Sequence, residues 1–180
     1  MTKKVLVVCG SPYANSHSDA LAAAFADGVK ESGNTVEWVK LSTKKISPCL
    51  GCSACRDSGN WECIIKDDTQ ELHKILQESD AVVLVTPLYF LTVTAQLKTF
   101  IDRLYTLHHS KKIQGKKSVL ISTSGGPGSH VLTDYFSALC GLLGWENVGT
   151  INKGGLPRAS EGPDENAKKE AFEMGKNLNL

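Results

Sequence analysis

The sequence predicts a doubly wound α/β fold, in which helices cover both faces of a parallel sheet. Short continuous apolar runs, such as residues 5–9 and 81–85, are typical of strands that are buried on both faces. Segments with a helical spacing of apolar residues alternate with these runs, which is the pattern of a parallel sheet. The runs end in loops rich in Gly, Ser and Pro, and such sheets bind their ligands at those strand ends.

Five strands are expected, at residues 5–9, 35–41, 81–85, 116–123 and 145–151. Helices are expected to begin at Asp19 and after capping residues 67–69, to follow the loop at 86–91, and to span 132–143 and 164–180. Gly33 and Gly144 stop two of these helices. We expect a single domain over residues 1–180, with a cysteine-rich loop at about 43–66 and a Gly/Pro-rich loop at 153–163.

The bulk composition excludes several classes of function. A formal net charge of +1 gives no reason to expect a nucleic acid or a membrane surface as partner. No apolar run approaches the span of a bilayer, and residues 1–4 lead into a strand rather than into a signal peptide. We therefore expect a cytoplasmic protein, in which six cysteines point to a cluster, a metal, catalysis or the core rather than to disulfides.

The loop at residues 10–18 connects the first strand to the first helix. Free N–H groups at a helix N-terminus, the helix dipole and serine hydroxyls together form an anion site. The loop lacks the Lys and the second Gly of a Walker A sequence, and it is not a Gly-x-Gly-x-x-Gly fingerprint. A serine-rich loop without a cation suits a monophosphate dianion, for which the phosphate of FMN is the obvious candidate. An ordinary turn with a capping serine is the alternative.

Three loops are expected at the same edge of the sheet, at residues 11–18, 87–91 and 124–128. The first offers phosphate donors, the second an aromatic and apolar wall, and the third a Gly-rich backbone that a ligand can approach closely. Together they fit a flat ring with a phosphate tail. The alternative for Tyr89 and Phe90 is that they are core or interface aromatics.

At these loops the sequence resembles the flavodoxin-like superfamily, and more closely the NAD(P)H-dependent FMN reductase and iron–sulfur flavoprotein group. The segments that carry the resemblance are GSPYANSHS, PCLGCSACRDSGNWECIIKDD and TPLYFLTVTAQLKTFIDRL. The last is the most specific of the three, and the resemblance covers essentially the whole chain. It implies a flavodoxin-like sheet with strand order 2-1-3-4-5, bound FMN, and a homodimer or homotetramer.

The resemblance also implies which residues contact FMN. The phosphate would be held by Ser11, Ser16, His17 and Ser18, the ring would be lined by Pro87, Leu88, Tyr89 and Phe90, and its other side would be approached by Ser124, Gly125 and Gly126. Two residues depart from the family pattern. Tyr13 stands where the family commonly has a basic residue, and Leu91 stands where it often has Gly, which narrows the space beside the ring. For Asp102 and Arg103 we expect a helix-surface or interhelical ion pair that needs no flavin.

Four cysteines are spaced closely in the irregular loop, at Cys49, Cys52, Cys55 and Cys63. Three thiols at every third residue can converge on one corner of a loop, and four thiolates suit either zinc or a [4Fe-4S] cluster. The triple spacing favours iron–sulfur and resembles the compact motif of the iron–sulfur flavoproteins. Uncoordinated thiols are the further alternative, since similar cysteines occur in cluster-free flavoreductases.

The remaining chemistry-bearing residues have simpler interpretations. Cys9 lies in a strand and Cys140 on an apolar helix stripe, so both are expected in the core. His108 and His109 are expected to form a pair at a helix end that is solvated or faces the helix dipole, and Trp61 could shield a cluster or a partner surface. No Ser/His/Asp order, His-Glu-x-x-His motif or carboxylate pair suggests amino-acid catalysis.

These features predict an FMN-dependent oxidoreductase, in which the flavin carries the chemistry. Electrons would pass from NAD(P)H, or from a ferredoxin-like donor, to a small acceptor such as a quinone or a flavin. One alternative is an iron–sulfur flavoprotein electron carrier that does not use nicotinamides. A flavodoxin-like carrier is disfavoured, because such carriers are usually strongly acidic. A metal-stabilised binding module without flavin is a further alternative. The sequence leaves the final acceptor and the choice between NADH and NADPH open.

Overall fold

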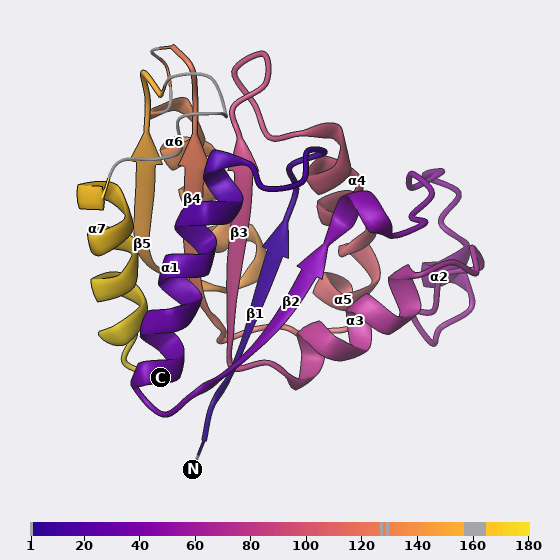
Figure 1. Cartoon of the computed structure of the whole chain (residues 1–180). Helices are drawn as coiled ribbons and strands as arrows, with labels where there is room; N and C mark the ends of the chain where they lie inside the picture. The colour runs from indigo at the N-terminus through magenta and orange to yellow at the C-terminus, as the bar shows by residue number, and fades with distance from the viewer. Residues whose placement is uncertain (1, 127, 129, 157–164) are drawn as a thin grey trace.

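The protein is built on a five-stranded parallel sheet with the strand order β2-β1-β3-β4-β5 (Figure 1). The computed structural model describes residues 2–126, 128, 130–156 and 165–180. The strands are β1 (Lys4–Cys9), β2 (Thr35–Lys40), β3 (Ala81–Pro87), β4 (Lys117–Thr123) and β5 (Glu146–Lys153). The expected doubly wound fold and its strand order are therefore confirmed.

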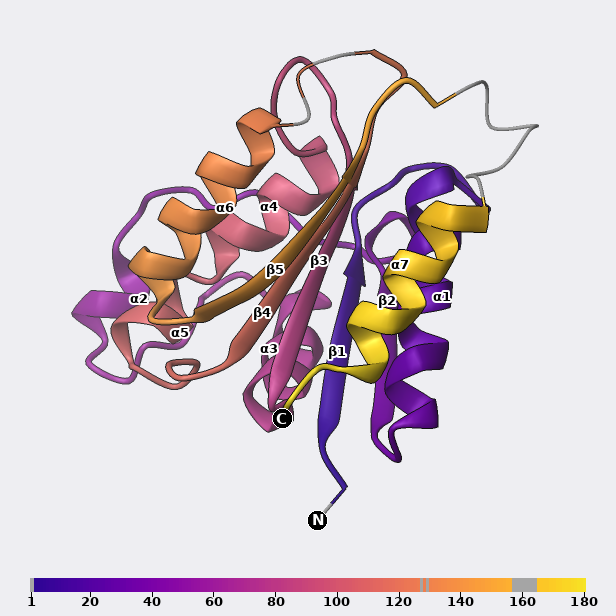
Figure 2. The same ribbon diagram turned by 90° about the vertical axis from the view of Figure 1, so that its left-hand side faces the viewer.

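Helices cover both faces of the sheet, because both faces are apolar. In β1, Val5 and Val7 pack with the core on one face, whereas Leu6 and Val8 pack with the core on the other. Figure 2 shows α1 (His17–Glu31) and α7 (Glu165–Lys176) on one side of the sheet. The other side carries α3 (Thr69–Glu78), α4 (Ala95–Arg103), α5 (Tyr105–His109) and α6 (His130–Leu143). No helix in the described part of the chain has the length and apolar character needed to span a membrane.

The first helix begins at His17, two residues before the expected start at Asp19. Ser16 is its N-cap: the Ser16 hydroxyl accepts a hydrogen bond from the Asp19 N–H at 3.2 Å. The Asp19 carboxylate accepts one from the Ser16 N–H at 3.3 Å. This reciprocal pair satisfies two N–H groups of the first turn and fixes the path of the chain into the helix.

The carboxyl ends of β1, β3 and β4 are neighbours in the sheet, so the loops that follow them meet at one edge. Gly10 follows β1 at this edge, where its N–H donates to Val85 O at 2.8 Å and its carbonyl accepts from Thr94 Oγ1 at 2.7 Å. A Cβ at Gly10 would lie 2.7 Å from the Cβ of Leu97. Only glycine therefore lets the first strand approach the N-terminus of α4 this closely.

The stretch that the sequence marks as irregular lies beyond the β2 edge of the sheet (Figure 1). It contains a 3₁₀ turn, η1 (Leu41–Thr43), and a one-turn helix, α2 (Ala54–Asp57), neither of which was expected. The helix after the 86–91 loop is divided at Leu104 into α4 and α5. The expected loop at 153–163 and the expected helix start at residue 164 lie largely outside the described residues, and β5 extends to Lys153.

Candidate functional site

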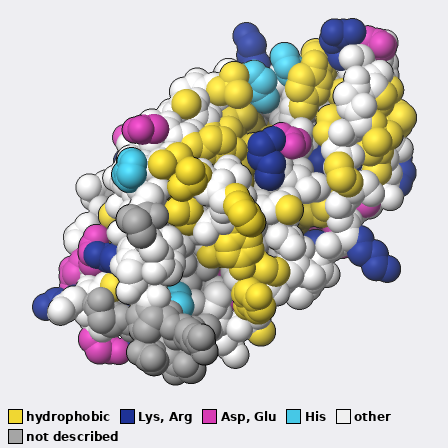
Figure 3. Space-filling model, turned by 90° about the horizontal axis from the view of Figure 1, so that it is seen from above, with side chains coloured by type: hydrophobic (Ala, Val, Ile, Leu, Met, Phe, Trp, Pro, Cys, Tyr) yellow, Lys and Arg dark blue, Asp and Glu magenta, His cyan; other side chains and the backbone are white. Residues whose placement is uncertain are grey.

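A cavity of about 170 Å³ opens where the three loops meet at the carboxyl edge of the sheet. It is lined by Ser11, Tyr13, Ser16, His17, Pro87, Leu88, Tyr89, Thr123, Ser124, Gly125 and Leu156. Figure 3 looks down on this end of the molecule and shows hydrophobic side chains gathered across its middle. We call this cavity the strand-end cavity.

Eight of the eleven residues expected to contact FMN line the strand-end cavity. The described residues that line it do not include Ser18, Phe90 or Gly126. Ser18 is fully buried and lies behind Ser16, whereas Phe90 is fully exposed. The sequence interpretation missed Thr123 and Leu156 as lining residues. Thr123 could have been found as the last residue of the fourth expected strand.

Serine hydroxyls gather at the end of the cavity nearest α1. Ser11 is fully buried, and its Oγ accepts a hydrogen bond from the Tyr13 N–H at 3.3 Å. The hydroxyls of Ser16 and Ser18 share a hydrogen bond of 3.0 Å. The first turn of α1, a helix of 15 residues, begins directly after Ser16. Hydroxyls and a positive helix end thus face the same space, which is the chemistry of an anion site.

Lys40 supplies a cation behind this loop. Its ammonium group donates to the Tyr13 carbonyl oxygen at 2.7 Å and forms an ion pair with Asp19. Tyr13 itself is two-thirds exposed and holds no charge that a phosphate could use. Lys40 therefore balances the carboxylate in the first turn of α1, which would otherwise repel an anion.

The loop after β3 has an unusual backbone. Tyr89 and Thr92 bond to each other through both backbone groups, each at 3.0 Å, so the loop closes into a tight turn. Phe90 has a φ of 48° and Leu91 a φ of 63°, in the left-handed region that favours glycine. The described lining residues do not include Leu91, and its effect on the space beside the ring stays a prediction. Burial and the neighbouring Tyr13 raise the pKa of the Tyr89 hydroxyl.

A second cavity, of about 210 Å³, lies under the cysteine-rich loop. All four loop cysteines line it, together with residues of α4 and α5 such as Arg103 and Tyr105. We call it the cysteine cavity. Among the described residues, no three His, Cys, Asp or Glu side chains are grouped closely enough to hold a single metal ion. The fold thus gathers the four thiols around one space without drawing them to one point.

Comparison with known proteins identifies the family. Residues 3–151 match the family model described as NADPH-dependent FMN reductase. The chain belongs to this family. It is accordingly an NAD(P)H-dependent FMN oxidoreductase, as the sequence predicts.

The relatives include proteins with and without iron–sulfur in their names. An iron-sulfur flavoprotein of Archaeoglobus fulgidus is 36% identical over 97% of this chain and 78% of its own length. The structure of an NAD(P)H:quinone oxidoreductase from Methanothermobacter marburgensis covers 100% of this chain and 98% of its own, with a TM-score of 0.77 and 21% identity. An FMN-dependent NADH-azoreductase of Bacillus anthracis, solved in complex with FMN, has a TM-score of 0.70 and 20% identity and covers 98% of this chain and 100% of its own. At these identities the two structures show only that this chain shares their fold.

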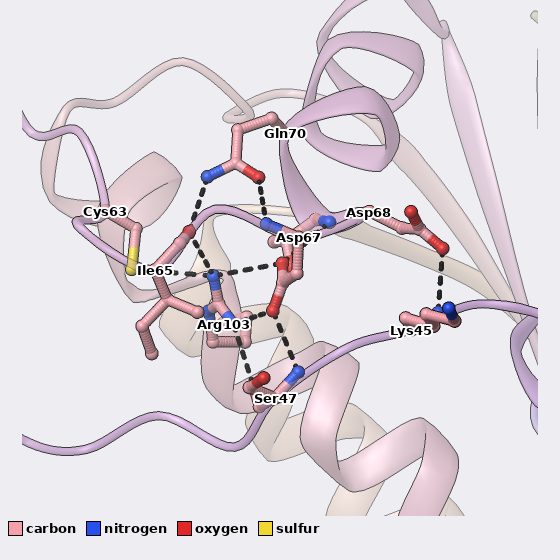
Figure 4. A network of polar contacts seen from close by, with 9 residues as sticks. Lys45, Ser47, Cys63, Ile65, Asp67, Asp68, Gln70 and Arg103 are labelled. Carbon is pink, nitrogen blue, oxygen red and sulfur yellow. Dashed lines mark hydrogen bonds and ion pairs between the residues drawn. The ribbon is translucent and has the colours of Figure 1, made fainter.

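Arg103 corrects one expectation from the sequence. Asp102 does form an exposed ion pair, with Lys98 one turn earlier in α4. The Arg103 side chain, in contrast, is only 1% exposed and pairs with Asp67 at 2.8 Å. Arg103 is thus a buried residue that reaches across the cysteine loop (Figure 4). The sequence did not reveal this, because the partners of Arg103 lie on the irregular cysteine loop, whose path helical spacing does not encode.

His109 is exposed at the end of α5, as expected, but it also contacts two aromatic rings. Its ring stacks on Trp61 with a centroid distance of 5.1 Å and an interplanar angle of 9°, and it lies 4.3 Å from the ring of Tyr105. Trp61 thereby ties the cysteine loop to α5. The two remaining cysteines are buried as expected, and burial raises the pKa of both Cys9 and Cys140.

Proposed function

We propose that the strand-end cavity binds FMN, with the phosphate against the 11–18 loop and the ring between residues 87–89 and 123–125. The observation that carries this proposal is that eight residues expected to contact FMN line a single cavity. The donor set fits the phosphate, because the cavity combines buried hydroxyls with the N-terminus of a 15-residue helix. When bound, FMN supplies the hydride and electron chemistry.

The residues of the chain bind and orient the cofactor in this proposal. The Ser11 oxygen accepts a hydrogen bond from the Tyr13 N–H, so the hydroxyl hydrogen of Ser11 points away from that bond and is available to donate to the phosphate. If Ser18 donates to Ser16, the Ser16 hydrogen is directed there as well. Pro87 and Leu88 supply an apolar wall that excludes water from the ring.

We further propose a small aromatic acceptor, such as a quinone or a flavin, with NAD(P)H as donor. Relatives are named for quinones and azo compounds, whose flat rings suit an apolar surface. Exposed apolar side chains adjoin the strand-end cavity at Tyr13, Phe90 and Leu91. Phe90 is also a candidate contact with a second copy in a homodimer or homotetramer. The proposed place of action is the cytoplasm, where the thiols stay reduced.

A substitution at Ser11 tests the phosphate site. Ser11→Ala removes one charge-assisted hydrogen bond, so we expect FMN to bind about tenfold more weakly, which corresponds to about 1.4 kcal/mol. Riboflavin lacks the phosphate, and its affinity should not change. Both affinities can be measured by quenching of flavin fluorescence, with Ser118→Ala as a control at a buried serine outside the cavity. An equal loss for FMN and riboflavin would contradict the proposed position of the phosphate.

A kinetic test addresses the donor and the acceptor. Protein reconstituted with FMN should oxidise NADPH without air when a benzoquinone is present. An FMN-loaded protein that oxidises almost no NADPH would instead be an electron carrier.

The cysteine cavity favours a second candidate function, that of an iron–sulfur flavoprotein. We propose that Cys49, Cys52, Cys55 and Cys63 hold a [4Fe-4S] cluster, which a ferredoxin-like protein would reduce. A single zinc ion draws its ligands to about 2.3 Å from one point, whereas a cluster needs thiols around a larger space. The four cysteines surround a space of about 210 Å³, so the donor set fits the cluster better than zinc.

Iron and acid-labile sulfide, measured on protein purified without air, test this candidate. We expect about four of each per chain. Cys63→Ser should lower both, whereas the core variant Cys140→Ser should keep them. Absence of iron and sulfide from the wild-type protein would reject the cluster and leave zinc or free thiols at the four cysteines.

A further inference from the structure

The guanidinium group of Arg103 connects both ends of the cysteine loop to α4 (Figure 4). Its Nη1 donates to Ser47 O at 2.7 Å and to Asp67 Oδ2 at 2.8 Å. Its Nη2 donates to Cys63 Sγ at 3.4 Å, to Asp67 Oδ1 at 3.4 Å and to Ile65 O at 3.5 Å. The Arg103 side chain thus contacts a residue before the first cysteine of the loop, the last cysteine itself, and two residues that follow the last cysteine.

Asp67 fixes this guanidinium in place. A buried charge is costly unless it is paired and hydrogen-bonded, and the Asp67 side chain is 8% exposed against 1% for Arg103. The carboxylate also accepts the Ser47 N–H at 2.8 Å and the Thr69 N–H at 3.0 Å. Burial opposes its ionisation, but hydrogen bonds from Thr69, Ser47 and Arg103 outweigh burial and hold the pKa of Asp67 well below its usual range.

The ion pair is oriented relative to the cysteine cavity. The hydrogen bond to the Cys63 sulfur comes from the guanidinium, so the positive member of the pair meets the thiol. Arg103 lines the cysteine cavity with the four cysteines. Arg103 itself is buried, so water screens its charge less than it would screen an exposed one, whereas Cys63 is half-buried.

We propose that Arg103, held by Asp67, is a positioning residue that raises the reduction potential of the cluster bound at the four cysteines. This inference rests on the iron–sulfur candidate proposed above. Reduction adds one electron to the cluster and therefore one negative charge. An N–H donor and a positive charge beside a cluster sulfur stabilise the reduced form more than the oxidised form.

The test is an anaerobic potentiometric titration of the cluster with dithionite, followed by electron paramagnetic resonance. In Arg103→Gln the one-electron reduction equilibrium should become about tenfold less favourable, a shift of about 59 mV to lower potential. Asp67→Asn removes the neighbouring negative charge but keeps Arg103, so the potential should rise. Arg103→Lys keeps the positive charge, so its reduction potential should lie between those of the wild type and Arg103→Gln. Arg56→Gln is the matched control, since Arg56 lies in the same loop but is more than half exposed and screened by water.

The opposite signs expected for Arg103→Gln and Asp67→Asn separate this role from loosening of the loop, which would move both variants in the same direction. Wild-type protein without iron and sulfide would overturn the cluster proposal and this inference with it. Wild-type protein with a cluster whose potential is unchanged in the variants would overturn the inference alone. If Arg103→Gln loses its cluster during purification, Asp67→Asn and Arg103→Lys decide: unchanged potentials in both would reject the proposal.

Discussion

The strand-end cavity and the cysteine cavity are held in shape by different means. The strand-end cavity is formed by loops that leave β1, β3 and β4, whose positions the hydrogen bonds of the sheet determine. The cysteine cavity is formed by a loop with a single helical turn, α2, and much of the loop has no regular structure. Its shape depends on side chains, above all on the buried ion pair between Arg103 and Asp67.

The different supports of the two cavities predict which single substitutions each cavity tolerates. A loop that leaves a strand keeps its position when one side chain is lost, because many backbone hydrogen bonds remain. A loop anchored on one ion pair loses stability when either charge is removed, because the other charge is then buried without its partner. The two sites should therefore respond differently to single substitutions.

The largest effect is expected at Arg103. Arg103→Met leaves Asp67 uncompensated, and we expect the free energy of unfolding to fall by about 3–5 kcal/mol. The double variant Arg103→Met with Asp67→Leu removes both charges and should recover most of this loss. Urea denaturation at pH 7 measures both. A double variant as unstable as the single one would show that contacts other than the ion pair hold the loop.

A pH effect should come from His73, in α3 beside this ion pair. Burial and the charge of Arg103 lower its pKa to about 4, partly opposed by Asp67. In the unfolded chain histidine titrates near pH 6.5, so the unfolded state takes up the proton first. The free energy of unfolding should therefore fall as the pH drops from about 6.5 to 4, by up to about 3 kcal/mol.

The variant His73→Gln should have a weaker dependence of stability on pH over this window. Denaturation with urea at a series of pH values measures it, and His130→Gln, at an exposed histidine of α6, is the control. Equal pH dependence in wild type and His73→Gln would mean that His73 is not kept neutral by burial. His73 lines a cavity together with the charged residues Glu62, Lys66 and Lys112. These three residues are unchanged in His73→Gln, so the comparison with the wild type isolates the histidine.

The contrast between loops fixed by the sheet and a loop fixed by side chains also explains which parts of the two sites could be predicted from the sequence. Alternating apolar runs define where strands end, so the residues after β1, β3 and β4 could be assigned to one cavity from the sequence alone. Ser11 and Tyr89 are found there. For the cysteine loop only the cysteine spacing carried information. Arg103 could not be recognised, because its partners Ser47, Cys63 and Asp67 depend on a loop path that no periodic pattern encodes.

The early helix start and the unforeseen aromatic stacking have similar physical causes. The helix was expected from Asp19 because apolar spacing begins there, but the actual start at His17 is set by the side-chain cap of Ser16. The stacking of His109 on Trp61 joins residues from two segments far apart in sequence. Long-range contacts of this kind leave no trace in local spacing.

A substitution at Gly10 tests how firmly the backbone fixes the strand-end cavity. In Gly10→Ala the new Cβ would meet Leu97 Cβ at 2.7 Å and Thr94 Oγ1 at 2.8 Å. We expect the free energy of unfolding to fall by about 1–3 kcal/mol and FMN to bind more weakly, because the loop after β1 must shift. Gly141→Ala, at a glycine of α6 where the new Cβ would meet no described atom within 4 Å beyond its chain neighbours and its own helix backbone, should be neutral or stabilising.

Both glycine variants can be measured by urea denaturation and flavin titration. If Gly10→Ala binds FMN as tightly as wild type, the close approach of β1 to α4 has no part in shaping the cavity.

The smallest effect is expected at Leu91, where the strand-end cavity borders strained backbone. Leu91→Gly relieves a left-handed conformation that costs a non-glycine residue about 1–2 kcal/mol, and it adds about 0.5–1 kcal/mol of unfolded-state entropy that opposes folding. The net gain in stability should be about 0.5 kcal/mol by these magnitudes. Leu91→Ala removes the same exposed side chain but keeps a Cβ at a φ of 63°, so it should show no gain. Urea denaturation of the wild type and both variants measures these differences. A gain of equal size in both variants would mean that the exposed leucine side chain, rather than the backbone conformation, lowers the stability of the wild type.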